Sequence, residues 1–144
     1  MTQTRTRLRT AAAALALSAA ALLPTALPAH AESRAEAQVN AFFGQYRDAV
    51  LGQNPNQDPL EVREEFLTPE LNTELDQWAA DHDADPVFRA QNVPVGWSVA
   101  YGGSGAGHTT VILTENWAGG GHTDVWYQVR LDTLQIDGLE DAPQ

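Results

Sequence analysis

The residues best suited to chemistry lie close together just after the middle of the chain. Three carboxylates and one imidazole fall within five positions: Asp81, His82, Asp83 and Asp85. The spacing of the aspartates resembles the start of an EF-hand calcium loop, but Pro86 stands where that loop needs glycine and Asn92 where it needs a bidentate glutamate. We therefore favour a solvated acidic loop over a calcium site, with Asp85 capping the turn at Pro86 and pairing with Arg89. We expect no metal and no cofactor.

The sequence offers little for nucleophilic catalysis. It has no cysteine, and none of the serines after residue 31 lies in a G-x-S-x-G motif. The glycine-rich stretch 102–107 lacks the lysine of a phosphate-binding loop, so we interpret it as a flexible hairpin connection. His82, His108 and His122 are bases in principle, although the last two sit beside glycine loops at expected strand ends. Composition leaves paired-carboxylate chemistry open, but no pattern singles out an acid, and no catalytic residue is predicted.

Aromatic residues provide the second candidate site. By alternation, Trp97, Tyr101 and Tyr127 point inward, where they meet Tyr46 and Trp78 from the helices. The favoured interpretation is that these side chains are core. In the alternative, some of them line a cavity for a small apolar ligand, with polar contacts at its rim. The predicted ligand-binding set is Tyr46, Asp85, Arg89, Gln91, Trp97, Tyr101 and Tyr127.

The first 31 residues have the three parts of an export signal. Arg5, Arg7 and Arg9 precede an apolar run over 11–23, and Ala29-His30-Ala31 supplies a small-residue cleavage site. The run is short for a bilayer span, so we expect a secreted or cell-envelope protein without membrane insertion after cleavage. The remaining 113 residues keep five arginines against 19 acids, hence a net charge of −14. Such a charge repels phosphate backbones, and we expect no nucleic-acid partner.

Periodicity predicts helices first and strands afterwards. A helix over 36–52 carries Val39, Phe42, Phe43 and Tyr46 on one face; a second begins after Asp58 and runs to about Leu67, and a third begins after Thr68. Strands are expected from Pro94, over 108–117, over 123–131 and over 133–137. A three-residue glycine loop at 119–121 would set Val111 opposite Val129 and Leu113 opposite Tyr127.

That register puts apolar side chains on one face of the central strands. Its inner face consists of Val111, Leu113, Val125, Tyr127, Val129 and Leu131. Ile112 and Trp126 are the apolar exceptions on the outer face. An isolated surface tryptophan is the plainer interpretation of this pair, and a homodimer contact is the alternative.

The expected architecture is an α+β domain over 32–139, with N-terminal helices packed on one face of a curved four-stranded antiparallel sheet and a disordered tail over 140–144. The most distinctive stretch of the sequence is D-x-D-P followed by R-A-Q-N-V-P over 83–94. With the Phe42-Phe43 helix, the Leu67-Thr68-Pro69-Glu70-Leu71 helix start and the meander, it resembles the secreted bacterial NTF2-like (cystatin-like) domains of unknown function. The resemblance implies a cone-shaped sheet around a long helix, a pocket in the cone and frequent dimers.

Two functions stay open. The first is a secreted, non-enzymatic NTF2-like module that binds a small ligand or an envelope protein. The second is an isomerase- or cyclase-like enzyme that uses the cone cavity for acid/base chemistry, with His82 or Asp85 as base. The enzyme needs a titratable group with a shifted pKa in a pocket open to solvent. Fold alone does not decide between them.

Overall fold

Capping side chains set the start of every helix. The computed structural model describes residues 32–144, and the expected export signal lies outside them. The helices are α1 (Arg34–Val50), α2 (Pro59–Phe66) and α3 (Pro69–His82). Ser33 and Asp58 each cap a helix in a reciprocal capping box with a glutamate three residues on, and the Thr68 side chain caps α3. All three predicted helices are confirmed. None of the helices in this part of the chain has the length and apolarity to cross a bilayer.

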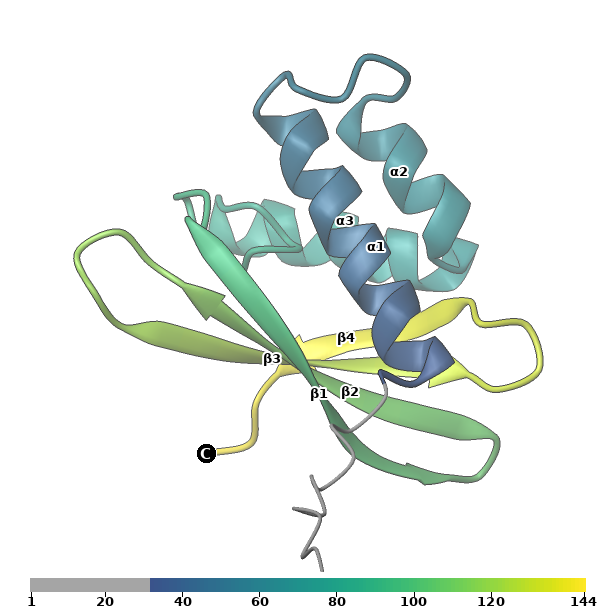
Figure 1. Cartoon of the computed structure of the whole chain (residues 1–144). Coiled ribbons are helices and arrows are strands. Elements are labelled where there is room, and N and C mark those ends of the chain that lie inside the picture. The colour runs from purple at the N-terminus through teal and green to yellow at the C-terminus, as the bar shows by residue number, and fades with distance from the viewer. Residues whose placement is uncertain (1–31) are drawn as a thin grey trace, which may run out of the picture. The chain divides into compact units, whose positions relative to one another are not determined.

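Four antiparallel strands follow in sequence order. They are β1 (Gly96–Gly105), β2 (His108–Asn116), β3 (His122–Arg130) and β4 (Ile136–Asp141), and they lie side by side in the order β1-β2-β3-β4. Figure 1 shows the helices on one side of a strongly twisted sheet. The predicted fold class is confirmed.

The core lies between α1 and the inner face of the sheet. Phe42 is fully buried, and its ring centroid lies 5.7–6.2 Å from those of Tyr46, Phe66 and Tyr127. On the sheet side, five of the six predicted inner residues are 0% exposed: Val111, Leu113, Val125, Tyr127 and Val129. The exception is Leu131, which is 52% exposed because β3 ends one residue before it.

The predicted register of the central hairpin is wrong by two residues. Val111 lies opposite Tyr127 and Leu113 opposite Val125, so the turn runs from Trp117 to Gly121. The longer turn is closed by two backbone hydrogen bonds between Trp117 and the glycines, to Gly121 O and from Gly120 N. A shift of two residues keeps every side chain on the predicted face, since side chains alternate with period two.

The glycine-rich stretch after Tyr101 is strand rather than loop, which corrects the prediction. β1 continues to Gly105, and the turn consists of Ala106 and Gly107, both at positive φ. A bulge at Gly102 follows the Tyr101 pair, so that Gly103 pairs with Thr110. Glycine weakens a strand, but ladder pairing to the well-formed β2 is enough to extend β1 here.

The position of the last strand also differs from the prediction. β4 begins at Ile136, three residues later than expected, and it includes Glu140 and Asp141, which pair with Trp126 and Val125. A disordered tail beginning at residue 140 is therefore wrong for these two residues. Leu134 lies in the preceding turn at a φ of 63°.

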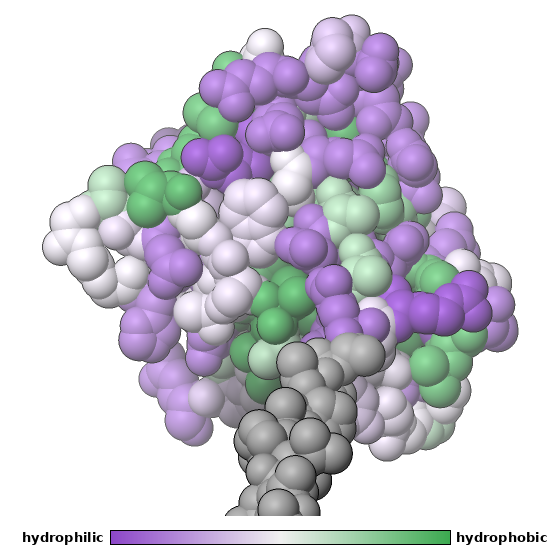
Figure 2. All heavy atoms as spheres, in the orientation of Figure 1, coloured by the Kyte–Doolittle hydropathy of each residue, from purple (hydrophilic) through white to green (hydrophobic). Residues whose placement is uncertain are grey.

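Hydrophilic side chains cover most of the face shown in Figure 2, and apolar atoms form small, separated patches. The large apolar side chains that are exposed come from five different segments: Leu51, Leu60, Val95, Tyr101 and Leu131. Val95 lies just before β1 and is 60% exposed.

Candidate functional site

The loop between α3 and β1 turns back on itself and directs Asp85 toward α1. Asp85 Oδ1 accepts hydrogen bonds from the backbone N–H groups of Val87 and Phe88, both at 2.9 Å. Its Oδ2 accepts the Tyr46 hydroxyl at 2.8 Å. The predicted cap at the Pro86 turn is confirmed. Burial, together with the Asp85 carboxylate, raises the pKa of Tyr46 well above its usual value, which keeps this hydroxyl a donor.

Arg89 does not pair with Asp85, in contrast to the prediction. It reaches across to β4, where Nη2 donates to Leu139 O at 2.8 Å and Nε lies 3.4 Å from the carboxylate of Asp141. The guanidinium sits 4.4 Å from the Trp78 ring centroid, and the Arg89 side chain is only 9% exposed. Burial lowers the pKa of Arg89, and Asp141 is the main opposing influence. Nε and Nη1 are buried without a hydrogen-bond partner.

Glu115 is a buried carboxyl that the sequence analysis missed. It follows Val111 and Leu113 on the inner face of β2 and is 0% exposed. Neither of its oxygens has a hydrogen-bond partner. Burial, followed by the negative charge of Asp85, raises its pKa to about 8, against the opposing influence of Arg89. The signal was present: an acid occupied the next inward position of an alternating apolar pattern.

Tyr127 completes a group that we call the buried triad: Arg89, Glu115 and Tyr127. Tyr127 is 0% exposed, and its hydroxyl also lacks a partner. Each member interacts electrostatically with the other two. Burial raises the pKa of Tyr127 well above its usual value, with Glu115 as the next cause, so the phenol stays protonated. The triad contains all five of the buried, unpartnered side-chain atoms found among residues 32–144.

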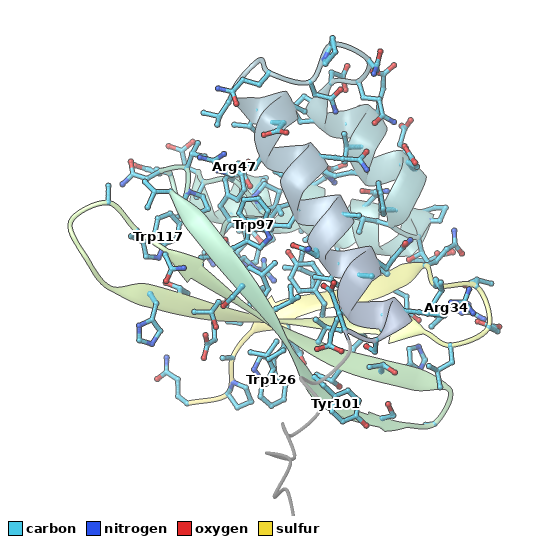
Figure 3. All side chains as sticks on the ribbon, viewed as in Figure 1. Arg34, Arg47, Trp97, Tyr101, Trp117 and Trp126 are labelled. Carbon is cyan, nitrogen blue, oxygen red and sulfur yellow. The ribbon has the colours of Figure 1, made fainter. Side chains whose placement is uncertain are left out.

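Of the remaining predicted ligand residues, Trp97 lies directly opposite Glu115 in the β1–β2 ladder, whereas Gln91 and Tyr101 are exposed. Trp97 packs on α1, where its Nε1 donates to Asn40 at 2.8 Å and its ring lies against Gly44, the one position of that helix without a side chain (Figure 3). Gln91 is exposed and donates to Asp83 O. Tyr101 lies opposite Val111 as alternation requires, but it is 50% exposed and bonds Ser104, so its predicted place in the interior is wrong.

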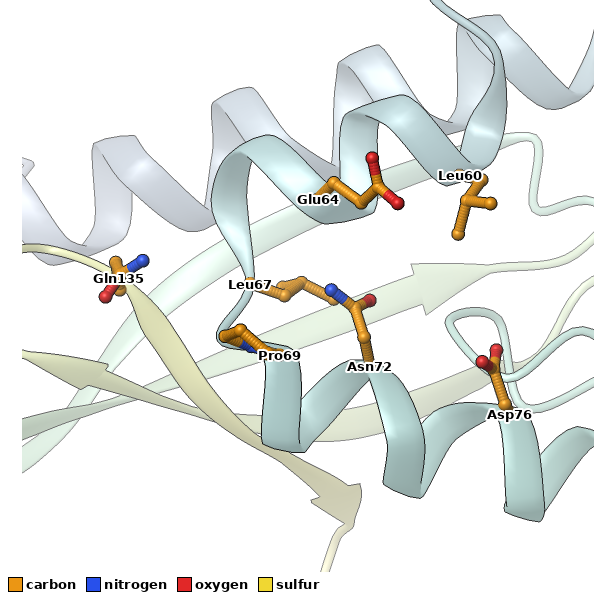
Figure 4. A pocket seen from close by; sticks show the side chains of 7 residues that line it. All are labelled: Leu60, Glu64, Leu67, Pro69, Asn72, Asp76 and Gln135. Atoms are coloured by element: carbon orange, nitrogen blue, oxygen red, sulfur yellow. The ribbon is translucent and has the colours of Figure 1, made fainter.

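Two surface cavities occur elsewhere in the described domain. The larger is an open groove of about 540 Å³ between α2 and α3 (Figure 4). Its lining residues are Leu60, Glu64, Leu67, Pro69, Asn72, Asp76 and Gln135. The smaller, of about 260 Å³, lies over the turn after α1. Neither is lined by a residue of the buried triad, whose side chains are at most 9% exposed.

Ile112 and Trp126 lie on the predicted outer face of the sheet, but the observed register changes their pairing. Ile112 and Trp126 lie directly opposite each other on β2 and β3, and both are half-buried. Thr110 and Gln128 form the next pair on this face and are hydrogen-bonded side chain to side chain. Apolar area on this face is thus confined to the neighbourhood of one tryptophan.

No group of three or more metal-ligating side chains occurs among residues 32–144. The aspartates of the 81–85 stretch instead form hydrogen bonds or helix caps with residues nearby in the sequence. Asp81 accepts from Gln77, and Asp83, at a φ of 48°, ends α3. His82 stacks on Trp78 with ring centroids 4.0 Å apart.

No protein-family model matches the sequence, and a search of curated proteins finds no match. Among solved structures, the chain is similar to the crystal structure of a protein of unknown function from Bacteroides thetaiotaomicron VPI-5482. The TM-score is 0.53 at 22% sequence identity, and the match covers 78% of this chain and 91% of that chain. At this identity, the likeness shows a shared α+β fold and nothing about activity.

Proposed function

We propose that this protein is an exported, non-enzymatic binding module of NTF2-like type that holds a small polar molecule at the buried triad. The observation that carries the proposal is the set of five unpartnered polar atoms on three side chains that are nine-tenths or more buried. A buried polar group without a hydrogen bond costs about 1–3 kcal/mol, so three such groups, each within electrostatic reach of the other two, favour a bound molecule that satisfies them.

The surroundings of the triad support binding over turnover. Asp85, the carboxylate expected to act as base, already accepts three hydrogen bonds, from Tyr46 and two backbone N–H groups. Glu115 and Tyr127 are both 0% exposed, so each exchange of the bound molecule requires the domain to open. A module that retains its ligand tolerates slow opening, whereas an enzyme must open at every turnover.

One observation favours the alternative, an acid/base enzyme. A pKa of about 8 leaves Glu115 protonated at neutral pH but able to lose its proton. The Asp85 carboxylate is one of the charges that hold it there. A buried carboxyl group that titrates near neutral pH can act as a general acid or base. In this alternative Glu115, rather than His82, is the group that exchanges a proton with the substrate.

Native mass spectrometry of protein purified from its own culture supernatant tests the proposal. We expect a co-purifying small molecule that Arg89→Gln releases. The matched control is Arg130→Gln, because Arg130 pairs with exposed Asp132 at the far side of the sheet and the charge change is identical. Retention of the molecule by Arg89→Gln, or its chemical conversion by the wild type, would contradict a binding role at the triad.

The outer face carries a separate proposal, a homodimer formed around Ile112 and Trp126. Its support is the cross-strand contact of two apolar side chains on an otherwise polar face. Size exclusion with light scattering decides it. A dimer that Trp126→Ala converts to monomer supports the contact, and a wild-type monomer removes it.

A further inference from the structure

The buried triad offers more hydrogen-bond donors than acceptors. Arg89 offers Nε and Nη1, which carry three N–H groups and no acceptor. Tyr127 keeps its hydroxyl proton, and Glu115 is protonated at neutral pH, so each adds a donor. Acceptor capacity is limited to the hydroxyl oxygen and the Glu115 oxygens. The site is therefore complementary to a molecule that mainly accepts hydrogen bonds.

The net charge of the triad also favours a ligand that accepts hydrogen bonds, because it favours an anion. With Glu115 protonated, the guanidinium of Arg89 is the one full charge in the triad. Its nearest carboxylate is Asp141, whose side chain is 68% exposed and whose oxygen lies 3.4 Å from Nε without hydrogen-bond geometry. Asp85 is held by Tyr46 and the backbone and makes no ion pair with Arg89. A cation would be repelled by the guanidinium, whereas an anion would add to the partial neutralisation that the exposed Asp141 supplies.

We infer that the molecule held by the buried triad is a small carboxylate, bound by Arg89 with Glu115 and Tyr127 as further donors. This inference rests on the proposed function and names its ligand class. The planar guanidinium matches the two oxygens of a carboxylate, and hydrogen bonds of this charge-assisted kind are the strong ones. Because Glu115 and Tyr127 are 0% exposed, we assign the site to a ligand of the size of formate or acetate, or to a larger molecule whose carboxylate end enters alone.

The titration of Glu115 gives this binding a pH dependence. The groups that act electrostatically on Glu115 are Asp85 and Arg89 from the loop after α3, Tyr127 from β3, and Asp141 from β4. Tyr46 from α1 acts on Tyr127. Loss of the Glu115 proton removes a donor and places a negative charge beside the ligand. Since carboxylates of this class stay ionised above pH 6, affinity falls once Glu115 ionises. If only the protonated form binds, a group titrating at about 8 weakens the apparent affinity by about tenfold between pH 7 and pH 9.

Three probes of similar size and different charge test the ligand class: sodium formate, formamide and methylammonium chloride. Each is titrated into the exported protein in carboxylate-free buffer, with ionic strength held constant by sodium chloride, and binding is followed by melting temperature and by NMR shifts. We expect formate to raise the melting temperature at pH 7 and to bind about tenfold more weakly at pH 9. Formamide and methylammonium should leave both signals unchanged.

Two variants separate the roles of the residues. Arg89→Gln should abolish the formate response, and Arg130→Gln should preserve it. Glu115→Gln keeps a donor that does not titrate, so it should bind formate with the pH step removed; this readout stands even where Arg89→Gln fails to fold. A pH step that persists in Glu115→Gln, or formate binding that survives in a folded Arg89→Gln, would overturn the inference.

The outcomes also separate the inference from the function on which it rests. Binding of formamide or methylammonium in place of formate would overturn the carboxylate class and leave a binding module standing. No response to any probe, together with no co-purifying molecule in native mass spectra, would overturn both.

Discussion

Replacing Glu115 by glutamine should stabilise the protein in a way that depends on pH. In the folded domain its pKa is about 8, against 4.5 for the ordinary side chain that the unfolded chain presents. As the pH rises above 4.5, the unfolded chain releases this proton while the folded domain retains it, so the wild type loses stability until the pH passes about 8. Glutamine does not titrate and is spared this loss.

The magnitude follows from the interval between the two pKa values. At about 1.36 kcal/mol per unit, the cost in the wild type reaches about 3 kcal/mol at pH 7 and about 5 kcal/mol at pH 9. The value of about 8 already includes the opposing influence of Arg89, and a carboxylate bound at the triad would raise the pKa of Glu115 and this cost further. Below pH 4 the cost vanishes, and the two proteins should differ only by a constant.

Urea denaturation of both proteins at half-unit steps from pH 4 to pH 9 measures this difference. We expect the stability advantage of Glu115→Gln to grow between pH 5 and pH 8 and then level off. Glu74→Gln on the exposed face of α3 is the matched control and should give a flat difference. A flat difference for Glu115→Gln as well would refute the assignment of a buried, protonated carboxyl.

Three further predictions concern contacts that hold the site and the domain together. Tyr46→Phe should cost about 1–3 kcal/mol in denaturation, because it removes the 2.8 Å hydrogen bond to the Asp85 carboxylate; no loss would mean that the bond contributes nothing. Arg63→Lys should destabilise the protein by a similar amount. The guanidinium of Arg63, which is 7% exposed, makes three hydrogen bonds that join α2 to α3, and an ammonium group cannot reproduce this geometry. A variant as stable as the wild type would contradict this. The pKa of His108 should lie above its usual value through its 2.7 Å contact with Asp137 and fall in Asp137→Asn when both are followed by NMR; an unchanged value would exclude the pair as its cause.

The fold was largely accessible from the sequence because its signals are local. Asp58 and Thr68 precede prolines, and each cap satisfies N–H groups of the helix that it begins, without help from the rest of the chain. The inner face of the central strands follows from period-two alternation, which a register error of two residues does not disturb. Registers and strand ends were less accessible, since the bulge at Gly102 and the long turn after Trp117 depend on pairing across strands.

The site was only partly accessible. Tyr46, Asp85, Arg89 and Tyr127 were identified as inward or rim residues, but the partners that distinguish them come from distant segments. Arg89 donates a hydrogen bond to Leu139, which is 50 positions away in the sequence. No local sequence pattern predicts that Arg89 binds Leu139 rather than the nearby Asp85. Glu115 was missed because an acid on an apolar face is ordinarily assigned to the solvent side. Its burial follows from the strand register and from the helices that cover that end of β2.

A crystal structure of the protein, at a resolution that reveals bound water and small ions, tests the central claim most directly. We predict electron density for a bound molecule in contact with Arg89 Nη1, the Tyr127 hydroxyl and Glu115, with all three side chains inside the domain. A triad with no bound molecule, or an Arg89 side chain turned outward to solvent, would contradict this prediction.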